Sequence, residues 1–61
     1  MGVMKILEIY NKLQKQYPNA EFLTEKDIVE AVGEESFLLL LRNFMITLDH
    51  KDENGVWMYS L

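Results

Sequence analysis

Few side chains in this 61-residue chain are of the types that catalyse reactions or bind metal ions. There is no cysteine, and the only imidazole belongs to His50, which stands in an acidic stretch. Nucleophilic catalysis by serine or threonine needs an adjacent base, and none of these hydroxyls lies in such a motif. We therefore expect no enzymatic activity, no metal and no cofactor, and an exposed strand-end position for His50.

Two pairs of adjacent acids, Glu34-Glu35 and Asp52-Glu53, are the remaining candidates for acid–base or cation chemistry. Neither pair has the Asp-x-Asp-x-Asp-Gly spacing of a calcium loop. Both pairs lie at predicted turns, where acidic residues serve solubility and helix capping. We interpret both as structural.

The charge of the chain argues against a strong nucleic-acid surface. Ten acidic and six basic residues give a net charge of −4, whereas phosphate-binding domains are normally basic or carry a lysine and arginine stripe. The favoured interpretation of the lysines on the first helix is a solvated helix face, and that of Arg42 is an ion pair with Glu34, Glu35 or Asp49. We therefore expect any DNA binding to be weak. The candidate nucleic-acid contacts are Lys12, Lys15, Arg42 and Lys51.

Composition predicts a single domain over residues 1–61. Hydrophobic residues make up 49% of the chain and aromatic residues 11%, which is enough for a packed core. No apolar run reaches the roughly 18 residues of a membrane span, and the opening segment lacks the pattern of a signal peptide. We expect a cytoplasmic protein.

Hydrophobic periodicity predicts three helices, near residues 3–16, 25–32 and 35–44. Pro18 ends the first helix near Gln16, because proline cannot continue a helix. Thr24 begins the second helix with Asp27 as its capping-box partner, and Gly33 ends it. The intervening Phe22-Leu23 suits a brief strand.

The chain then alternates between apolar and polar residues, which predicts a β-hairpin over residues 46–61. Asn54-Gly55 marks the turn, because both residues tolerate positive φ. We expect Trp57 to pack in the core against the third helix. The alternative is an outward Trp57 that stacks on a base or anchors a partner.

This order of elements predicts an α+β fold that resembles the winged helix-turn-helix, with three helices and a C-terminal hairpin wing. The segments Val3–Ile9 and Gly55–Leu61 resemble the first helix and closing strand of the module at the carboxyl end of archaeal minichromosome maintenance helicases. The chain departs from that module at the end of the third helix, where a glycine normally precedes the wing and this chain has Phe44-Met45-Ile46. The resemblance implies a non-enzymatic appendage of a nucleic-acid machine.

The third helix is apolar almost all the way round, unlike a helix that reads DNA. Aligning Gly33 with the turn glycine of helix-turn-helix domains places Leu38, Leu39 and Met45 or Ile46 inward. The outward residues then form a docking face for a protein partner or a second copy; the alternative is a central helix covered by the first helix and the hairpin. The predicted partner-binding residues are Phe37, Leu40, Leu41 and Phe44.

Two functions follow from these patterns. The favoured one is a winged-helix module that acts mainly through protein–protein contacts in replication or transcription machinery. The alternative is a small dimeric DNA-binding transcriptional regulator, whose affinity for DNA would fall steeply with salt.

Overall fold

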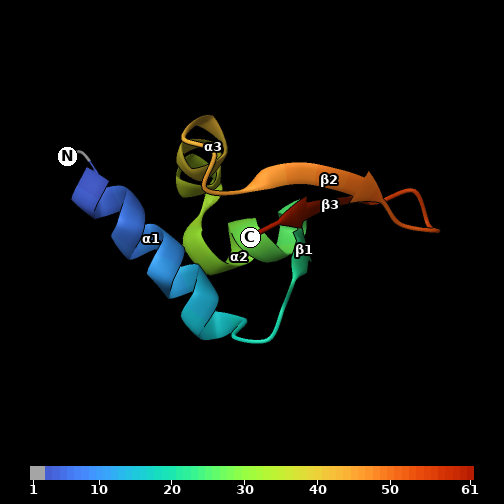
Figure 1. Ribbon diagram of the computed structural model, residues 1–61, viewed down its shortest axis with the longest axis horizontal. Helices are drawn as coiled ribbons and strands as arrows, with labels where there is room; N and C mark the ends of the chain where they lie inside the picture. Colours follow the sequence, from blue (N-terminus) through green and yellow to red (C-terminus); the bar gives the residue numbers. More distant parts are fainter. Residues whose placement is uncertain (1–2) are drawn as a thin grey trace.

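The computed structural model describes residues 3–61, with the side chains of Val3 and Met4 outside that description. The fold is α+β and winged-helix-like, as the sequence predicted, with three helices followed by a hairpin that joins an earlier strand (Figure 1). None of the described helices combines the length and hydropathy needed to cross a membrane. The elements are α1 (Val3–Gln16), β1 (Phe22–Thr24), α2 (Glu25–Val32), α3 (Glu34–Arg42), β2 (Thr47–Lys51) and β3 (Trp57–Ser60).

The local signals at the ends of α1 and α2 are confirmed. Helix α1 ends at Gln16, two residues before the proline. At the start of α2 the Asp27 N–H donates to Thr24 Oγ1 at 3.1 Å, and the Thr24 N–H donates to Asp27 Oδ2 at 3.5 Å. Gly33 ends α2 with φ +93°, and its N–H donates to the Val29 carbonyl at 2.8 Å.

The three strands form one antiparallel sheet with β3 in the centre and β1 and β2 at its edges. Leu23 and Leu48 lie on either side of Tyr59 in the register, so β3 links the short early strand to the hairpin. The register between β2 and β3 shifts between Leu48 and His50, which leaves Asp49 as the extra residue of a bulge. Bulges and charged residues are common devices that discourage further pairing at an exposed edge.

The hairpin turn is longer than the two-residue Asn-Gly turn that the sequence suggested. Within the turn only Gly55 has positive φ, at +81°. The Asp52 N–H donates to the Val56 carbonyl at 2.9 Å. Residues 53–55 are therefore a three-residue loop that ends on a left-handed glycine. Asp52 Oδ1 accepts hydrogen bonds from the N–H groups of Asn54 and Val56, at 2.8 and 2.9 Å, which confirms a structural role for this carboxylate.

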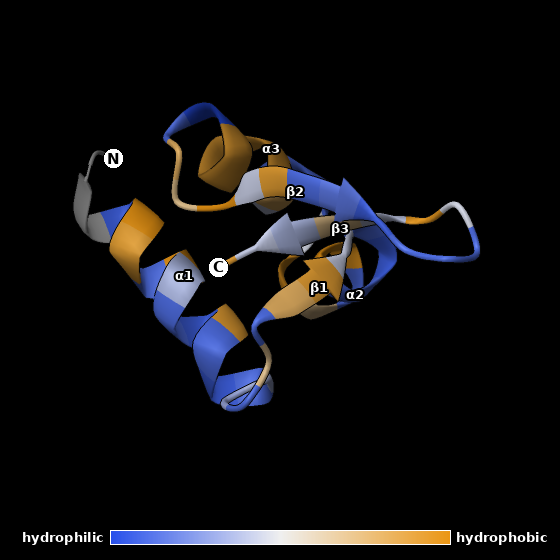
Figure 2. Ribbon diagram, turned by 45° about the vertical axis from the view of Figure 1, so that its right-hand side comes forward, coloured by the Kyte–Doolittle hydropathy of each residue, from blue (hydrophilic) through white to orange (hydrophobic). Residues whose placement is uncertain are grey.

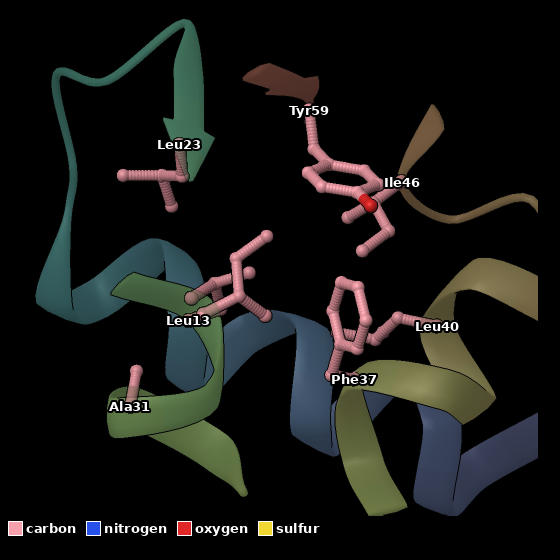
Figure 3. Close-up of a cluster of buried hydrophobic side chains, with 8 residues drawn as sticks. Leu13, Leu23, Ala31, Phe37, Leu40, Ile46 and Tyr59 are labelled. Carbon is pink, nitrogen blue, oxygen red and sulfur yellow. The ribbon is translucent and has the colours of Figure 1, made fainter. Parts of the chain in front are cut away.

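One hydrophobic core joins the helices to the sheet (Figure 3). The Phe37 ring from α3 meets the Tyr59 ring from β3 edge to face, with centroids 5.3 Å apart. Such aromatic pairs contribute about 0.5–1.5 kcal/mol beyond the area that they bury. The buried residues are Leu13, Leu23, Ile28, Ala31, Phe37, Leu40, Ile46 and Tyr59.

Candidate docking site

Two of the four predicted partner-binding residues point into the core. Phe37 is 4% exposed and Leu40 is fully buried, and both side chains lie in the buried cluster with Tyr59 and Ile46 (Figure 3). The prediction that Phe37 and Leu40 face outward is wrong. Spacing of i, i+3, i+4 and i+7 shows which residues share a face of a helix, but it does not show which way that face points.

The rotation of α3 has a local cause as well as a tertiary one. Gly33 is both the C-cap of α2 and the N-cap of α3, so it is the single residue between the two helices. The direction of α3 is therefore set at one residue, and the aromatic pair with Tyr59 holds the helix in that rotation. As a consequence Leu38, which the sequence placed inward, is 47% exposed. Leu39 and Met45 are half-buried, and Ile46 is buried as predicted.

The end of α3 brings Phe44, but not Leu41, to the surface. The helix ends at Arg42, two residues before the predicted end at Phe44. Phe44 has φ +58°; its N–H donates to the Leu41 carbonyl at 3.2 Å, and the Met45 N–H donates to the Leu40 carbonyl at 2.9 Å. These two bonds form a Schellman motif, in which the left-handed position is usually glycine. Leu41 is half-buried against the core.

The Phe44 side chain contributes little to the stability of the fold, although its backbone helps to end α3. Its side chain is 82% exposed, the highest value among the large hydrophobic residues described. A left-handed backbone costs an L-residue roughly 1–2 kcal/mol, and a glycine would avoid that cost. An exposed aromatic ring on a strained backbone, at a position that favours glycine, points to a role outside folding. We call Leu41 and Phe44 together the Phe44 end.

A second feature of α3 lies on its exposed side, where residues of α3 and Lys5 of α1 line one groove. A groove of about 350 Å³ has Leu38 and Leu39 among its walls, with charged side chains around them. This groove was not predicted from the sequence, although the spacing of Glu35, Leu38 and Arg42 on one helical face was a usable signal. The residues that line the α1–α3 groove are Lys5, Glu35, Leu38, Leu39 and Arg42.

Arg42 does not form the ion pairs that the sequence suggested. Glu34, Glu35 and Asp49 were its expected partners, and none of them lies within 4.0 Å of its guanidinium. Within residues 5–61 the single contact of that kind joins the side chains of Asp49 and His50. Arg42 is therefore an exposed cation at the end of α3, where its positive charge interacts favourably with the negative end of the helix dipole.

The candidate nucleic-acid contacts lie on separate elements rather than along one stripe. Lys12 and Lys15 share the outer side of α1 with Glu8, and the shallow hollow there is walled by that helix alone. Lys51 lies on the hairpin, with its Nζ 5.3 Å from the centroid of the Trp57 ring, within the range of a cation–π interaction. The first turn of α3 instead carries two exposed acids, Glu34 and Glu35.

Trp57 lies outside the core, and the expectation that it packs against the third helix is wrong. It is 45% exposed, whereas Tyr59 is 9% exposed and makes the contact with α3. The two residues share one side of β3 because side chains alternate along a strand. Trp57 is nearer the hairpin turn, which projects beyond the helices (Figure 1), so no helix covers its ring.

His50 occupies the exposed strand position that the sequence predicted. Its Nδ1–H donates to Asp49 Oδ2 at 2.7 Å, and its ring meets the Phe22 ring edge to face at a centroid distance of 4.9 Å. Over the described part of the chain, no three His, Cys, Asp or Glu side chains gather in a way that could hold a metal ion.

Comparison of the chain with protein-family models, with curated proteins and with solved structures finds no match. The site is therefore interpreted from its own geometry. Two features stand out on that basis, the Phe44 end and the α1–α3 groove.

Proposed function

We propose that this chain is a non-enzymatic protein-interaction module that docks onto a partner protein through the Phe44 end. The observation that carries the proposal is Phe44 itself, whose ring is 82% exposed on a backbone with φ +58°. The ring buries little surface in the fold, yet the left-handed backbone at Phe44 lowers the stability of the fold.

The geometry of the Phe44 end suits an anchor. Two backbone hydrogen bonds of the Schellman motif hold Phe44, and a side chain with only two rotatable bonds loses little entropy on binding. Burying a large apolar side chain contributes roughly 1.5–3 kcal/mol, which is the magnitude of an interface hot spot. The expected partner presents an apolar pocket that accepts an aromatic ring.

The alternative function, a dimeric DNA-binding regulator, has less support. In helix-turn-helix proteins the first residues of the recognition helix contact the bases, and here those positions are Glu34 and Glu35. Phosphates would repel both side chains, and the net charge of −4 adds to that repulsion. The basic residues are too dispersed to compensate.

We place the module within replication or transcription machinery. The support is the winged-helix-like order of elements, together with the resemblance of the opening and closing segments to the carboxyl-terminal module of archaeal minichromosome maintenance helicases. In this proposal the wing and helices serve as a scaffold that presents the Phe44 end.

The test places a photo-crosslinking phenylalanine analogue at position 44 and, as a control, at the exposed Leu48 on β2. We expect position 44 alone to capture a defined protein from a nuclease-treated extract of the host cell. That protein is then purified and titrated with the wild-type chain, Phe44→Ala and Phe44→Gly. Loss of the ring should weaken binding by about 2 kcal/mol, or roughly 30-fold. Equal capture from both positions, or unchanged affinity in both variants, would contradict the proposal.

The DNA alternative is tested separately by titrating duplex DNA at several salt concentrations. We expect no binding with a slope that corresponds to several phosphate contacts. A steep salt dependence that is reduced by Lys51→Gln or Arg42→Gln would instead support the DNA-binding regulator.

A further inference from the structure

The charges around the α1–α3 groove are ordered along α3. Glu35 lies in the first turn, Leu38 near the middle and Arg42 in the last turn, and all three line the groove. Their spacing of i, i+3 and i+7 puts them on one side of the helix. The exposed side of α3 therefore carries an acidic residue, a leucine and a basic residue, in that order from its beginning to its end.

Glu35 and Arg42 cannot satisfy each other within one chain. Seven residues separate them, which corresponds to about 10.5 Å along a helix axis. No ion pair between any carboxylate and either Arg42 or Lys5 is present within the described residues. The groove thus presents unpaired charges of both signs beside Leu38, whose side chain is 47% exposed.

We propose that the α1–α3 groove binds a second copy of this chain, with the two α3 helices packed antiparallel about a twofold axis. The order of charges is complementary to itself only in that orientation. Glu35 then faces Arg42 of the second copy, Arg42 faces Glu35 of the second copy, and the two Leu38 side chains meet near the axis. A parallel pair would place like charges together, and antiparallel packing also aligns the helix dipoles favourably.

The short length of α3 limits the area that this dimer can bury, and therefore its affinity. Helix α3 has nine residues, and a contact built on one short helix falls below the roughly 1,200 Å² of a standard interface. We therefore expect a weak dimer, with a Kd on the order of 0.1 mM. Lys5 adds a further cation at the rim of the groove.

This inference goes beyond the proposed function and rests on different residues. Neither Leu41 nor Phe44 lines the groove, so a dimer through α3 leaves the Phe44 ring of each copy available. Failure of the dimer would leave the Phe44 end unaffected, and failure of Phe44-dependent docking would leave the dimer unaffected.

The test is a charge exchange followed by sedimentation velocity from about 10 µM to about 2 mM, a range that brackets the expected Kd. The wild-type chain should shift from monomer to dimer over this range. Glu35→Arg alone and Arg42→Glu alone should both remain monomeric, because each brings like charges together twice across the axis. An equimolar mixture of the two variants should recover the dimer, since both pairs are then complementary.

Matched variants separate the interface from general charge effects. Glu34→Arg makes the same charge reversal as Glu35→Arg, in the same turn of α3 but outside the groove. Lys15→Glu reverses a positive charge, as Arg42→Glu does, but in the last turn of α1 and outside the groove. Both should dimerise as the wild type does, and so should Phe44→Gly. All the altered side chains are exposed, so each variant should keep a cooperative thermal transition.

Three results would overturn the inference. The first is a wild-type chain that is monomeric at every concentration. The second is a mixture of Glu35→Arg and Arg42→Glu that stays monomeric although both variants are folded. The third is loss of the dimer in Phe44→Gly with no effect of the charge reversals, which would move self-association to the Phe44 end.

Discussion

Helices α2 and α3 are both followed closely by a residue with positive φ, but that residue is a glycine after α2 and a phenylalanine after α3. Gly33, which has φ +93°, caps the end of α2, and Phe44, which has φ +58°, lies just after the end of α3. Gly33 connects two helices directly and belongs to the architecture of the fold. Phe44 closes a Schellman motif at the surface, with its ring 82% exposed.

The difference shows how conformational cost is distributed in this small domain. Glycine reaches positive φ without a steric penalty, so the α2–α3 junction is formed at low cost. Phenylalanine at the α3 terminus raises the cost and covers none of the core. A position that opposes folding yet exposes an aromatic ring is better explained by an external contact than by stability.

Replacing Gly33 should have the largest effect on stability. The pair φ +93° and ψ +159° lies in a region that is almost restricted to glycine, where other residues lose about 1–3 kcal/mol. A Cβ at Gly33 would meet no heavy atom within 4 Å, so the loss is due to the backbone alone. We expect Gly33→Ala to lower the free energy of unfolding by about 2 kcal/mol and the Tm by about 10 °C.

Gly55→Ala is the control for this prediction, because Gly55 is also open to a Cβ but has φ +81° in the hairpin loop. Calorimetry should give a loss of about half that of Gly33→Ala. Equal losses in the two variants would show that the helix junction imposes no special requirement.

Replacing Phe44 should change stability in the opposite direction. Phe44→Gly relieves the left-handed backbone and removes a ring that covers little of the core, so it should stabilise the domain by about 1 kcal/mol. Phe44→Ala removes the same ring but keeps the strain, and it should leave the free energy of unfolding nearly unchanged. Urea titration of both variants separates the two effects, and equal stabilities would show that φ +58° imposes no cost.

Asn43 should have the smallest effect at this helix end. Its Nδ2–H donates to the Leu39 carbonyl at 2.8 Å on an exposed surface. Net contributions of such hydrogen bonds are about 0.5 kcal/mol when both groups are open to water. Asn43→Ala should lower the Tm by a few degrees, whereas a loss larger than that of Gly33→Ala would reverse the ranking of the two helix ends.

Local signals in the sequence determined most of the elements of this fold. Pro18 marked the end of α1, and the Thr24 capping box and Gly33 marked the bounds of α2. Alternation after residue 46 predicted the hairpin, and Phe22-Leu23 indicated a brief strand, which the structure shows to pair with β3. These features depend on backbone conformation and on neighbours within a few residues, so the chain itself encodes them.

The tertiary structure decided which faces are buried, and with them the candidate docking sites. An apolar helix such as α3 (Figure 2) has several rotations that hide leucines, and the core contacts of Phe37 and Leu40, among them the pairing of Phe37 with Tyr59, accompany the one observed. In the same way, Tyr59 rather than Trp57 lies under α3 because of the position of the sheet along the helices. Periodicity reports which residues share a face, whereas the choice between faces depends on contacts between residues far apart in the chain.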